Sequence, residues 1–250
     1  MIDEDLSAVL QARLGQSRSL VGASRIGRPG FTCDAANASS KEAGDGNRSF
    51  VEPDADCEIK YFQGATDNLV SIAHVEIPRL VVDIRGDGNT IVVGESRKFQ
   101  GRIGIVGDRN IFFFGRDATC NRGNFVITGS DLAIVFGDDC MLSFDISVRA
   151  GDSHGVFDVA TLSALSEPAD ILVEPHVWLG EGATVLKGSH IGAGSIVGAS
   201  AVVNAAHPAM SVLAGTPARV IRSGVSWTRQ LAPAQAERQR VRGLIQAFLG

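Results

Sequence analysis

Aliphatic residues recur at every sixth position between residues 173 and 203, and this is the clearest pattern in the chain. A period of six fits neither the 3.6-residue repeat of an α-helix nor the two-residue alternation of a strand. A residue no larger than valine follows each of the first five aliphatic residues by four positions. Two positions in every six therefore face a narrow interior, and three hexads make one coil of a stacked solenoid. The aliphatic positions are Val173, Leu179, Val185, Ile191, Val197 and Val203, and the small ones are Val177, Ala183, Ser189, Ser195 and Ala201.

Short β-rich runs that end in Gly, Asp or Asn fill the region from Ile59 to Val148. We expect these runs to form degenerate coils of the same solenoid, with bulkier phenylalanines at some inward positions. The sequence thus predicts an amino-terminal helix and low-complexity segment over 1–58 and a β-helix domain over 59–227. A loop insertion at 150–171 interrupts the domain, and a helix over 228–250 follows it.

The two ends of the chain carry amphipathic patterns. Near the amino terminus, a predicted helix places Leu6, Val9, Leu10 and Leu14 on one stripe that docks on another surface. Residues 22–49 are rich in Gly, Ser, Ala and Asn and are expected to form a loop. Near the carboxyl terminus, a second helix is expected to cover the open end of the solenoid. Its apolar face consists of Val241, Leu244, Ile245 and Phe248.

Charge and cysteine content exclude several classes of protein. The net charge is −5 and no basic block occurs, so nucleic acid and anionic lipid are not expected partners. No apolar run reaches the ~18 residues that a membrane span needs, so membrane insertion is not expected. The cysteines are too far apart for a disulfide framework or a zinc site. Free thiols favour a cytoplasmic enzyme; they are Cys33, Cys57, Cys120 and Cys140.

The run "HVWLGEGATVLKGSHIGAGSIVGASAVV", followed by "AGTPARVIR", resembles the hexapeptide-repeat acyltransferases, most of all those that O-acetylate capsular or surface polysaccharides. This resemblance covers more than half of the chain. It implies a left-handed parallel β-helix, acetyl-coenzyme A as co-substrate, and a homotrimer whose sites are shared between chains. The handedness rests on the resemblance, because parallel crossovers are otherwise right-handed in about 98% of cases.

A break in the repeat between Arg149 and Ile171 contains the main catalytic candidate, His154. Loops held by a rigid scaffold are common places for functional residues. The resembling O-acetyltransferases carry a D-S-H-like segment here, and its histidine acts as general base. A neutral imidazole can accept the proton of a hydroxyl that attacks a thioester. The resemblance therefore assigns catalysis to His154, ring orientation to Asp152 or a backbone carbonyl, and acceptor contact to Ser153.

Trp178 and His176 are the next candidates. A tryptophan cannot enter the narrow interior of a coil, so Trp178 is expected on the outside, where its apolar face needs a cover. The resemblance places it beside the thioester, in a catalytic and a cofactor-binding role. His176 is expected in an outward position, where it contacts the acceptor, lines the cofactor groove or lies on solvated surface. No site role is expected for His74, His190 and His207.

The coenzyme is expected along the outside of the last coils, in a groove between subunits. Its amide-rich pantetheine arm needs backbone flanked by small side chains. The candidates for this contact are Gly180, Gly198, Ser200 and Ala201. Guanidinium groups of Arg219 and Arg222 are expected to pair with the phosphates.

The sequence departs from the family pattern at Asn204 and Ala205, where relatives carry Thr and Lys. One contact with the coenzyme's nucleotide end is therefore missing. This departure affects the expected pose of the coenzyme more than its identity.

The expected reaction is the transfer of an acetyl group from acetyl-coenzyme A to a hydroxyl of a bacterial surface saccharide or its precursor, with no metal required. One alternative is acetylation of an amino sugar, serine or another small acceptor. Another is a zinc enzyme similar to γ-class carbonic anhydrases, which is disfavoured because no second histidine stands at the close spacing of that family. A third is a non-catalytic β-solenoid used for assembly.

Overall fold

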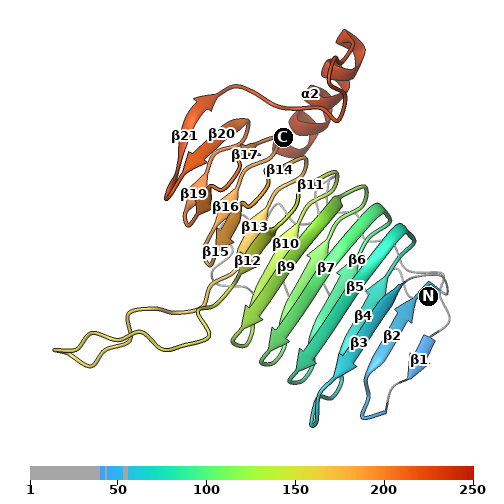
Figure 1. Cartoon of the computed structure of the whole chain (residues 1–250), viewed down its shortest axis with the longest axis vertical. Helices are drawn as coiled ribbons and strands as arrows, with labels where there is room; N and C mark the ends of the chain where they lie inside the picture. Colours follow the sequence, from blue (N-terminus) through green and yellow to red (C-terminus); the bar gives the residue numbers. More distant parts are fainter. Residues whose placement is uncertain (1–39, 43, 53–55) are drawn as a thin grey trace.

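The computed structural model describes residues 40–42, 44–52 and 56–250, which form a long parallel β-solenoid (Figure 1). From β2 onward, each strand of the first sheet is followed along the chain by one or two strands of the second sheet. The first sheet contains, in order, β1 (Ser40–Glu42), β2 (Arg48–Val51), β4 (Leu69–Ile72), β6 (Thr90–Val93), β8 (Ile111–Phe114), β10 (Ala133–Phe136), β13 (Ile171–Val173), β16 (His190–Ile191) and β19 (Ala206–His207).

The second sheet contains the remaining strands. Some of them are long because a single strand runs along two faces of its coil. Its members are β3 (Cys57–Tyr61), β5 (Val75–Arg85), β7 (Ser96–Val106), β9 (Thr119–Thr128), β11 (Met141–Leu142), β12 (Ile146–Arg149), β14 (Trp178–Leu179), β15 (Thr184–Leu186), β17 (Ile196–Val197), β18 (Val202–Val203), β20 (Ser211–Gly215) and β21 (Ala218–Ser223). Strand pairs are parallel except β1 with β2 and β20 with β21.

The carboxyl-terminal coils have the predicted triangular hexad geometry. Leu172 pairs with His190 and Trp178 pairs with Ile196, so each position meets its counterpart three hexads further along the chain. Every aliphatic position of the hexads is fully buried, and the small positions are buried as well. The interior is too narrow for anything larger than Leu, because the strands of a coil approach one another across it. The prediction of stacked hexads is confirmed.

The amino-terminal coils are wider than the hexads predict. Leu69 pairs with Thr90 and Thr90 with Ile111, so one turn of the chain is longer here than three hexads. Long strands replace pairs of short ones: β9 pairs with both β11 and β12 of the next coil. These coils belong to the same solenoid, as expected, but their repeat differs from that of the carboxyl-terminal coils. Residues at equivalent corners are 21 positions apart for Asn68 and Asn89 and 22 for Arg109 and Asp131.

Phenylalanine side chains fill the wider interior. Five of them, Phe99, Phe112, Phe114, Phe125 and Phe136, are no more than 1% exposed. Their rings touch in sequence, with centroids 4.5 Å apart for Phe99 and Phe114 and 5.1 Å for Phe112 and Phe125. Aromatic pairs in such offset or edge contacts add to the stabilisation from burial. The added residues in each coil thus make room for a core of rings, as the sequence predicted for inward phenylalanines.

Buried asparagines stand at one corner of four successive turns, each 21 residues from the next. The side chain of Asn89 donates to Asn68 Oδ1 at 2.9 Å and to the Gly107 carbonyl at 3.0 Å. Its own Oδ1 accepts from the backbone N–H of Asn110 at 2.9 Å. The ladder satisfies backbone groups that a tight corner leaves unpaired. It comprises Asn47, Asn68, Asn89 and Asn110 and ends at the position of Leu132.

Helix α2 (Gln235–Leu249) confirms the predicted carboxyl-terminal helix. Val241, Ile245 and Phe248 are buried, and they pack with Ala193 and Met210. These partners lie at a corner of the final coils, so α2 covers that corner, whereas β21 pairs with β20 at the end of the sheet (Figure 1). The expected cap over the open end is therefore a strand, and the helix lies to its side.

Two further expectations concern the amino-terminal region. The predicted helix of Leu6, Val9, Leu10 and Leu14 lies outside the described residues, as does most of the predicted loop. Parallel pairing already begins at β2, ahead of residue 59, because the ladder corner at Asn47 starts a coil there. Among the described helices, none is both long and apolar enough to cross a membrane.

Candidate functional site

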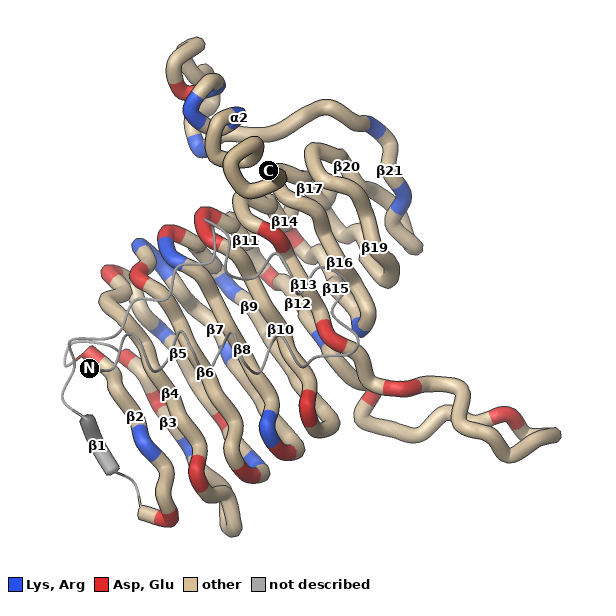
Figure 2. Tube along the Cα trace, turned by 180° about the vertical axis from the view of Figure 1, so that it is seen from behind, with Lys and Arg blue, Asp and Glu red and all other residues tan. Residues whose placement is uncertain are grey.

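The break in the repeat forms an arm that projects from the solenoid between β12 and β13 (Figure 1). Residues 150–170 carry acidic side chains and no Lys or Arg, as Figure 2 shows along the arm. A bridge between Phe157 and Ala164 closes its outer part as a hairpin. Several apolar side chains on it are exposed, with Val159 at 83% and Leu162 at 75%.

Asp152 anchors the base of the arm. Its carboxylate accepts hydrogen bonds from Lys187 Nζ and Ser166 Oγ. The hydrogen bond from Lys187, followed by that from Ser166, holds the pKa of Asp152 below its usual value. Ser166 belongs to the returning half of the arm, whereas Lys187 follows β15 in the next coil. The Asp152 carboxylate therefore joins the two ends of the arm and fastens them to that coil.

His154 lies in the exposed arm two residues beyond this anchor. Among the described residues it has no hydrogen bond or ion pair, and Asp152 is engaged elsewhere. Ser153 sits in a left-handed backbone conformation, and its Oγ lies 3.2 Å from Thr128 Oγ1. The structure thus exposes the His154 ring, as a base acting on a bound acceptor requires. It does not supply the ring contact expected from Asp152.

Trp178 lies on the outside of β14, as predicted, and its side chain is 36% exposed. Its neighbours along the stack are Met141 of β11 and Ile196 of β17. The indole of Trp178 is partly covered by Trp227, which is close to the carboxyl terminus. The centroids of the two rings are 6.1 Å apart, and the angle between the ring planes is 52°. The remaining exposed area of Trp178 is available to a ligand or a second subunit.

Trp227 belongs to a segment, residues 225–231, that runs back across the coils; we call it the C-terminal strap. Its indole stacks on His176 with centroids 4.2 Å apart and an interplanar angle of 9°. Trp227 Nε1 donates to the His176 carbonyl at 2.8 Å, and His176 Nε2 lies 2.9 Å from the Trp227 carbonyl, which can only accept. The strap is therefore fixed to the corner that precedes Trp178.

The other nitrogen of His176, Nδ1, lies 2.8 Å from Asp139 Oδ2. Burial alone would raise the pKa of Asp139, but the hydrogen bond and charge of His176 and the charge of Arg229 lower it below the usual value. Arg229 also bonds Thr119 Oγ1 at 2.9 Å and the Cys140 carbonyl at 3.2 Å. The strap thereby ties a narrow coil at His176 to wide coils at Asp139 and Thr119.

His176 is 1% exposed, and both ring nitrogens are engaged within the chain. The His176 ring lies outside the coil, against the strap, but it is not on solvated surface. The cause is the C-terminal strap, which covers the corner. Contact of His176 with an acceptor stays a prediction, and in this arrangement neither nitrogen is free to make it.

His154 and Trp178 are not brought together within one chain. The arm enters β13 at one end, and Trp178 follows the corner at the other end of that strand. One whole face of the triangular coil thus lies between the two candidate residues. A site that uses both needs the arm of one chain and the outer wall of another.

The four residues predicted to contact pantetheine differ in exposure and in the space around them. A Cβ at Gly180 would lie 2.8 Å from the Val197 carbonyl, so coil stacking by itself requires glycine there. Gly198 leaves more room, with 3.2 Å to the Leu213 carbonyl, and Ser200 is exposed at a corner. Ala201 is buried, and its N–H and carbonyl are both bonded. The contacts stay predictions, and Ala201 has no free group to make one.

Arg219 and Arg222 lie on β21, whose side chains are exposed beyond Ala218. Arg219 Nη1 bonds the carbonyl of Ala218 at 2.9 Å. The side chains are therefore placed at the carboxyl-terminal end of the solenoid, on the strand that follows the file of Trp178, Ile196 and Val212. Their predicted pairing with phosphates stays a prediction.

The described residues contain no group of three or more His, Cys, Asp or Glu side chains placed to hold a metal ion. Cys57, Cys120 and Cys140 are free thiols, and Cys33 lies outside the described residues. Burial raises the pKa of each described thiol to about 12. These cysteines therefore stay protonated at neutral pH and are poor nucleophiles.

Comparison with known proteins connects this geometry to a family. A protein of Escherichia coli strain K12 named as a lipopolysaccharide biosynthesis O-acetyl transferase, WbbJ, is 32% identical over 151 residues, which are 56% of this chain and 74% of that protein. The chain belongs to the hexapeptide-repeat O-acetyltransferase family. Its resemblance at the level of repeats and motifs is thereby confirmed.

Two other members of the hexapeptide-repeat O-acetyltransferase family are named polysialic acid O-acetyltransferase. The one from Escherichia coli O1:K1 is 36% identical over 115 residues, which cover 46% of this chain and 37% of the relative. The one from Neisseria meningitidis is 24% identical over 150 residues, which cover 51% of this chain and 70% of the relative. The chain therefore spans little more than a third of the first of these relatives. No protein-family model matches the chain.

Solved structures of family members agree on the fold. The polySia-specific acetyltransferase NeuO superposes with a TM-score of 0.65 and 21% identity, and the match covers 78% of this chain and 99% of NeuO. The polysialic acid O-acetyltransferase OatWY gives the same TM-score at 19% identity, covering 78% of this chain and 98% of OatWY. The expected left-handed parallel β-helix is confirmed.

Sequence reasoning missed the residues that surround Trp178 and His176. Trp227 is 51 positions from His176, and Arg229 is 90 positions from Asp139. No period or local motif connects such pairs. A signal was present in the rarity of tryptophan, because the chain has two and both lie at this corner.

Proposed function

We propose that the protein transfers an acetyl group from acetyl-coenzyme A to a hydroxyl of a surface saccharide or its precursor. The observation that carries the proposal is that the same chain presents an exposed histidine, His154, on a projecting arm and a partly exposed tryptophan, Trp178, on the outer wall of hexapeptide coils. Membership of the O-acetyltransferase family supports the reaction class. Relatives named for polysialic acid and lipopolysaccharide support a saccharide acceptor.

In the proposed reaction His154 takes the proton of the acceptor hydroxyl as its oxygen attacks the thioester carbonyl carbon. The carbon–sulfur bond then breaks, and the coenzyme leaves as a thiol after receiving the proton. Backbone N–H groups near the thioester stabilise the oxyanion that develops. General-base assistance of this kind accelerates a reaction by about 10²- to 10⁴-fold. No covalent enzyme intermediate and no metal are needed.

The donor lies along the coils between Trp178 and β21 in this proposal. Trp178 offers exposed apolar surface beside the thioester, Gly198 and Ser200 flank the pantetheine arm, and Arg219 and Arg222 face the phosphates. Guanidinium groups suit phosphate oxygens because their fork of donors allows two parallel hydrogen bonds. We place the reaction in the cytoplasm, where free thiols such as Cys140 persist.

The proposal includes a homotrimer with shared sites. A whole coil face separates His154 from Trp178 in one chain, so each site draws its arm from a neighbouring subunit. Apolar side chains of the arm, including Val159, Leu162 and Leu165, are exposed in the single chain and would gain cover from that neighbour. Closed rings of identical subunits arise from such head-to-tail contacts.

Steady-state acetyl transfer from acetyl-coenzyme A to a panel of saccharide, amino-sugar and serine acceptors tests the reaction. His154→Ala is expected to lower kcat by about 10²- to 10⁴-fold while the affinity for coenzyme A stays nearly unchanged. His74→Ala, another exposed histidine, serves as the matched control and should keep full activity. Near-normal turnover of His154→Ala would remove His154 as the base.

Trp178→Ala tests the outer wall in the same assay. The expected result is a raised KM for acetyl-coenzyme A, because the apolar cover beside the thioester is lost. Unchanged kinetics would give the indole a purely structural role.

A further inference from the structure

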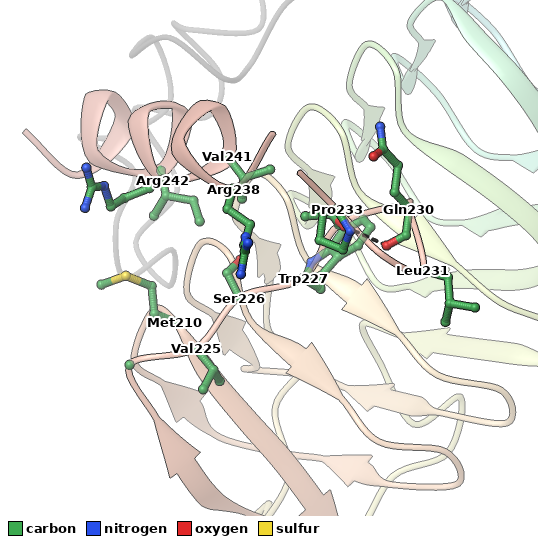
Figure 3. Close-up of a pocket in the computed structure, with 13 residues that line it drawn as sticks. Met210, Val225, Ser226, Trp227, Gln230, Leu231, Pro233, Arg238, Val241 and Arg242 are labelled. Atoms are coloured by element: carbon green, nitrogen blue, oxygen red, sulfur yellow. Dashed lines mark hydrogen bonds between the residues drawn. The ribbon is translucent and has the colours of Figure 1, made fainter. Parts of the chain in front are cut away.

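A pocket of about 490 Å³ lies between α2 and the C-terminal strap (Figure 3). It falls within the size range of small-molecule sites. The strap and the adjoining Gly224 form one wall, to which every strap residue except Arg229 contributes, and α2 forms the other with Arg238, Val241, Arg242 and Ile245. None of the residues assigned above to the donor lines this pocket.

The pocket has an unbalanced positive charge. Arg238 and Arg242 line it from successive turns of α2, and none of the lining residues is acidic. Neighbouring arginines on the same part of the chain are neutralised: Arg229 pairs with Asp139, and Arg240 pairs with Glu237. Within the described part of the chain, the guanidinium groups of Arg238 and Arg242 have no hydrogen-bond or ion-pair partner. In a chain of net charge −5, two such groups over one cavity favour an anionic ligand.

The remaining wall is apolar and aromatic. Trp227, Val241 and Ile245 line the pocket together with Met210, and Arg238 extends from α2 toward Ser226 in Figure 3. A ligand that fits both the arginine side and the apolar wall of the pocket has a compact body with an apolar face and one anionic group. Trp227 is 6% exposed and its ring is stacked on His176, so the apolar face of such a ligand would lie on less buried side chains, those of Met210, Val225 and Leu231. A sugar ring with a carboxylate has this form, because its C–H face can lie on these side chains while the carboxylate meets the guanidinium fork.

The pocket lies close to the proposed transfer site, because the side chain of Trp227 borders both the pocket and Trp178. Trp227 lines it, and the ring of Trp227 is 6.1 Å from that of Trp178. A saccharide bound here can therefore extend toward Trp178, where the thioester is proposed to lie. A separate small molecule in the pocket would need no such proximity.

We propose that this pocket is an acceptor subsite for a carboxylate-bearing sugar unit, held by Arg238 and Arg242 between α2 and the C-terminal strap. The inference rests on the proposed function and makes it more specific, since it names an acidic saccharide as the acceptor. It also assigns a binding role to α2, which otherwise only packs against a corner of the coils.

Calorimetry on the full chain tests the subsite without any need for turnover. The probes are N-acetylneuraminic acid and glucuronic acid, each measured against its own methyl ester, together with coenzyme A and inorganic phosphate. The wild type should bind at least one acid about tenfold or more tightly than its ester, and the double variant R238Q/R242Q should lose that preference. R79Q, which removes an exposed arginine on β5, is the matched control and should keep it.

Three results would overturn the subsite. One is equal binding of acid and ester by the wild type, or no binding of either acid. Another is a preference that survives in R238Q/R242Q. The third is binding of phosphate or coenzyme A, and of neither acid, that depends on the two arginines, since this would assign the pocket to another ligand.

Acetyl transfer by the same variants separates the subsite from the reaction. We expect R238Q/R242Q to raise KM for acidic acceptors about tenfold while kcat, and transfer to the esters, stay near the wild-type values. Equal transfer to acids by both proteins would refute the subsite and leave the reaction intact. Acid binding at the arginines without transfer to any hydroxyl would support the pocket and refute the reaction.

Discussion

The wide coils and the narrow coils of this solenoid use the same strand stacking for different purposes. Wide coils repeat every 21 or 22 positions, enclose phenylalanine rings and satisfy one corner with buried asparagines. Narrow coils repeat every three hexads, enclose Val, Ile and Leu, and turn their corners with small residues. Candidate site residues gather at and beyond the change from wide to narrow. The arm projects where the change occurs, and the strap crosses it.

The difference shows that core volume sets coil length. A ring needs more cross-section than an aliphatic side chain, and the added residues in each turn supply it. The outer surfaces of the wide and the narrow coils also differ. Narrow coils present small residues near Trp178, which suits a slender donor, whereas the corners of the wide coils carry exposed Arg–Asp pairs such as Arg109 with Asp131.

The largest effect on stability is expected where a ring leaves the wide core. Phe112 is fully buried and touches Phe99 and Phe125, so Phe112→Ala should lower the free energy of unfolding by about 3–5 kcal/mol. Val197→Ala in a narrow coil removes less volume and should cost about 2 kcal/mol. Denaturant titration measures both. Equal losses of unfolding free energy would contradict the claim that phenylalanine rings provide the main stabilisation of the wide coils.

Breaking the asparagine ladder should cost about 3 kcal/mol. Asn89→Ala removes bonds to Asn68, Gly107 and Asn110 and leaves the partner groups buried without replacements. Asn204→Ala, at an exposed corner of the narrow region, is the matched control and should change the free energy of unfolding by less than about 0.5 kcal/mol. A small loss for Asn89→Ala, measured by the same titration, would show that water can replace the ladder.

The strap that joins the two regions should respond to acid. The pKa of Asp139 in the folded chain lies below its ordinary value of 3.8, so its stabilisation is fully present above pH 3.8 and disappears as pH falls through the folded-state pKa. Asp139→Asn should therefore cost about 2 kcal/mol at neutral pH and little in strong acid.

Asp145→Asn is the control for this prediction. Asp145 pairs with Arg122 on the exposed surface, where solvent screening leaves such pairs little effect on stability. Unfolding titrations at several pH values compare the two variants. A loss for Asp139→Asn that does not change with pH would contradict the assigned ion pairs.

The narrow coils could be predicted residue by residue, because each position repeats its environment every three hexads. Val185 and Ala183 were assigned inward correctly from the hexad pattern. The longer repeat was visible in Asn47, Asn68, Asn89 and Asn110, which are spaced by 21 positions, but the spacing lengthens to 22 and Leu132 ends the series. Its length was therefore missed, although its inward phenylalanines were expected.

The candidate site was predictable as far as it depends on local sequence. The arm, its histidine and the outward tryptophan follow from a break in the repeat and from the size of an indole. The partners of Trp178 and His176 do not, since Trp227 and Arg229 reach them from a distant part of the chain. The separation of His154 from Trp178 also required the topology, because the sequence between them includes both the arm and a whole face of the coil.

Subunit complementation tests the shared site most directly. At acetyl-coenzyme A concentrations well below the raised KM of Trp178→Ala, both His154→Ala and Trp178→Ala are expected to form trimers with little acetyl transfer. When the two are unfolded and refolded together, random assortment pairs an intact arm with an intact outer wall at about a quarter of the sites. The account predicts recovery of roughly that fraction of wild-type activity. Mixed trimers that stay as inactive as the two separate variants would contradict a site built from His154 of one chain and Trp178 of the next.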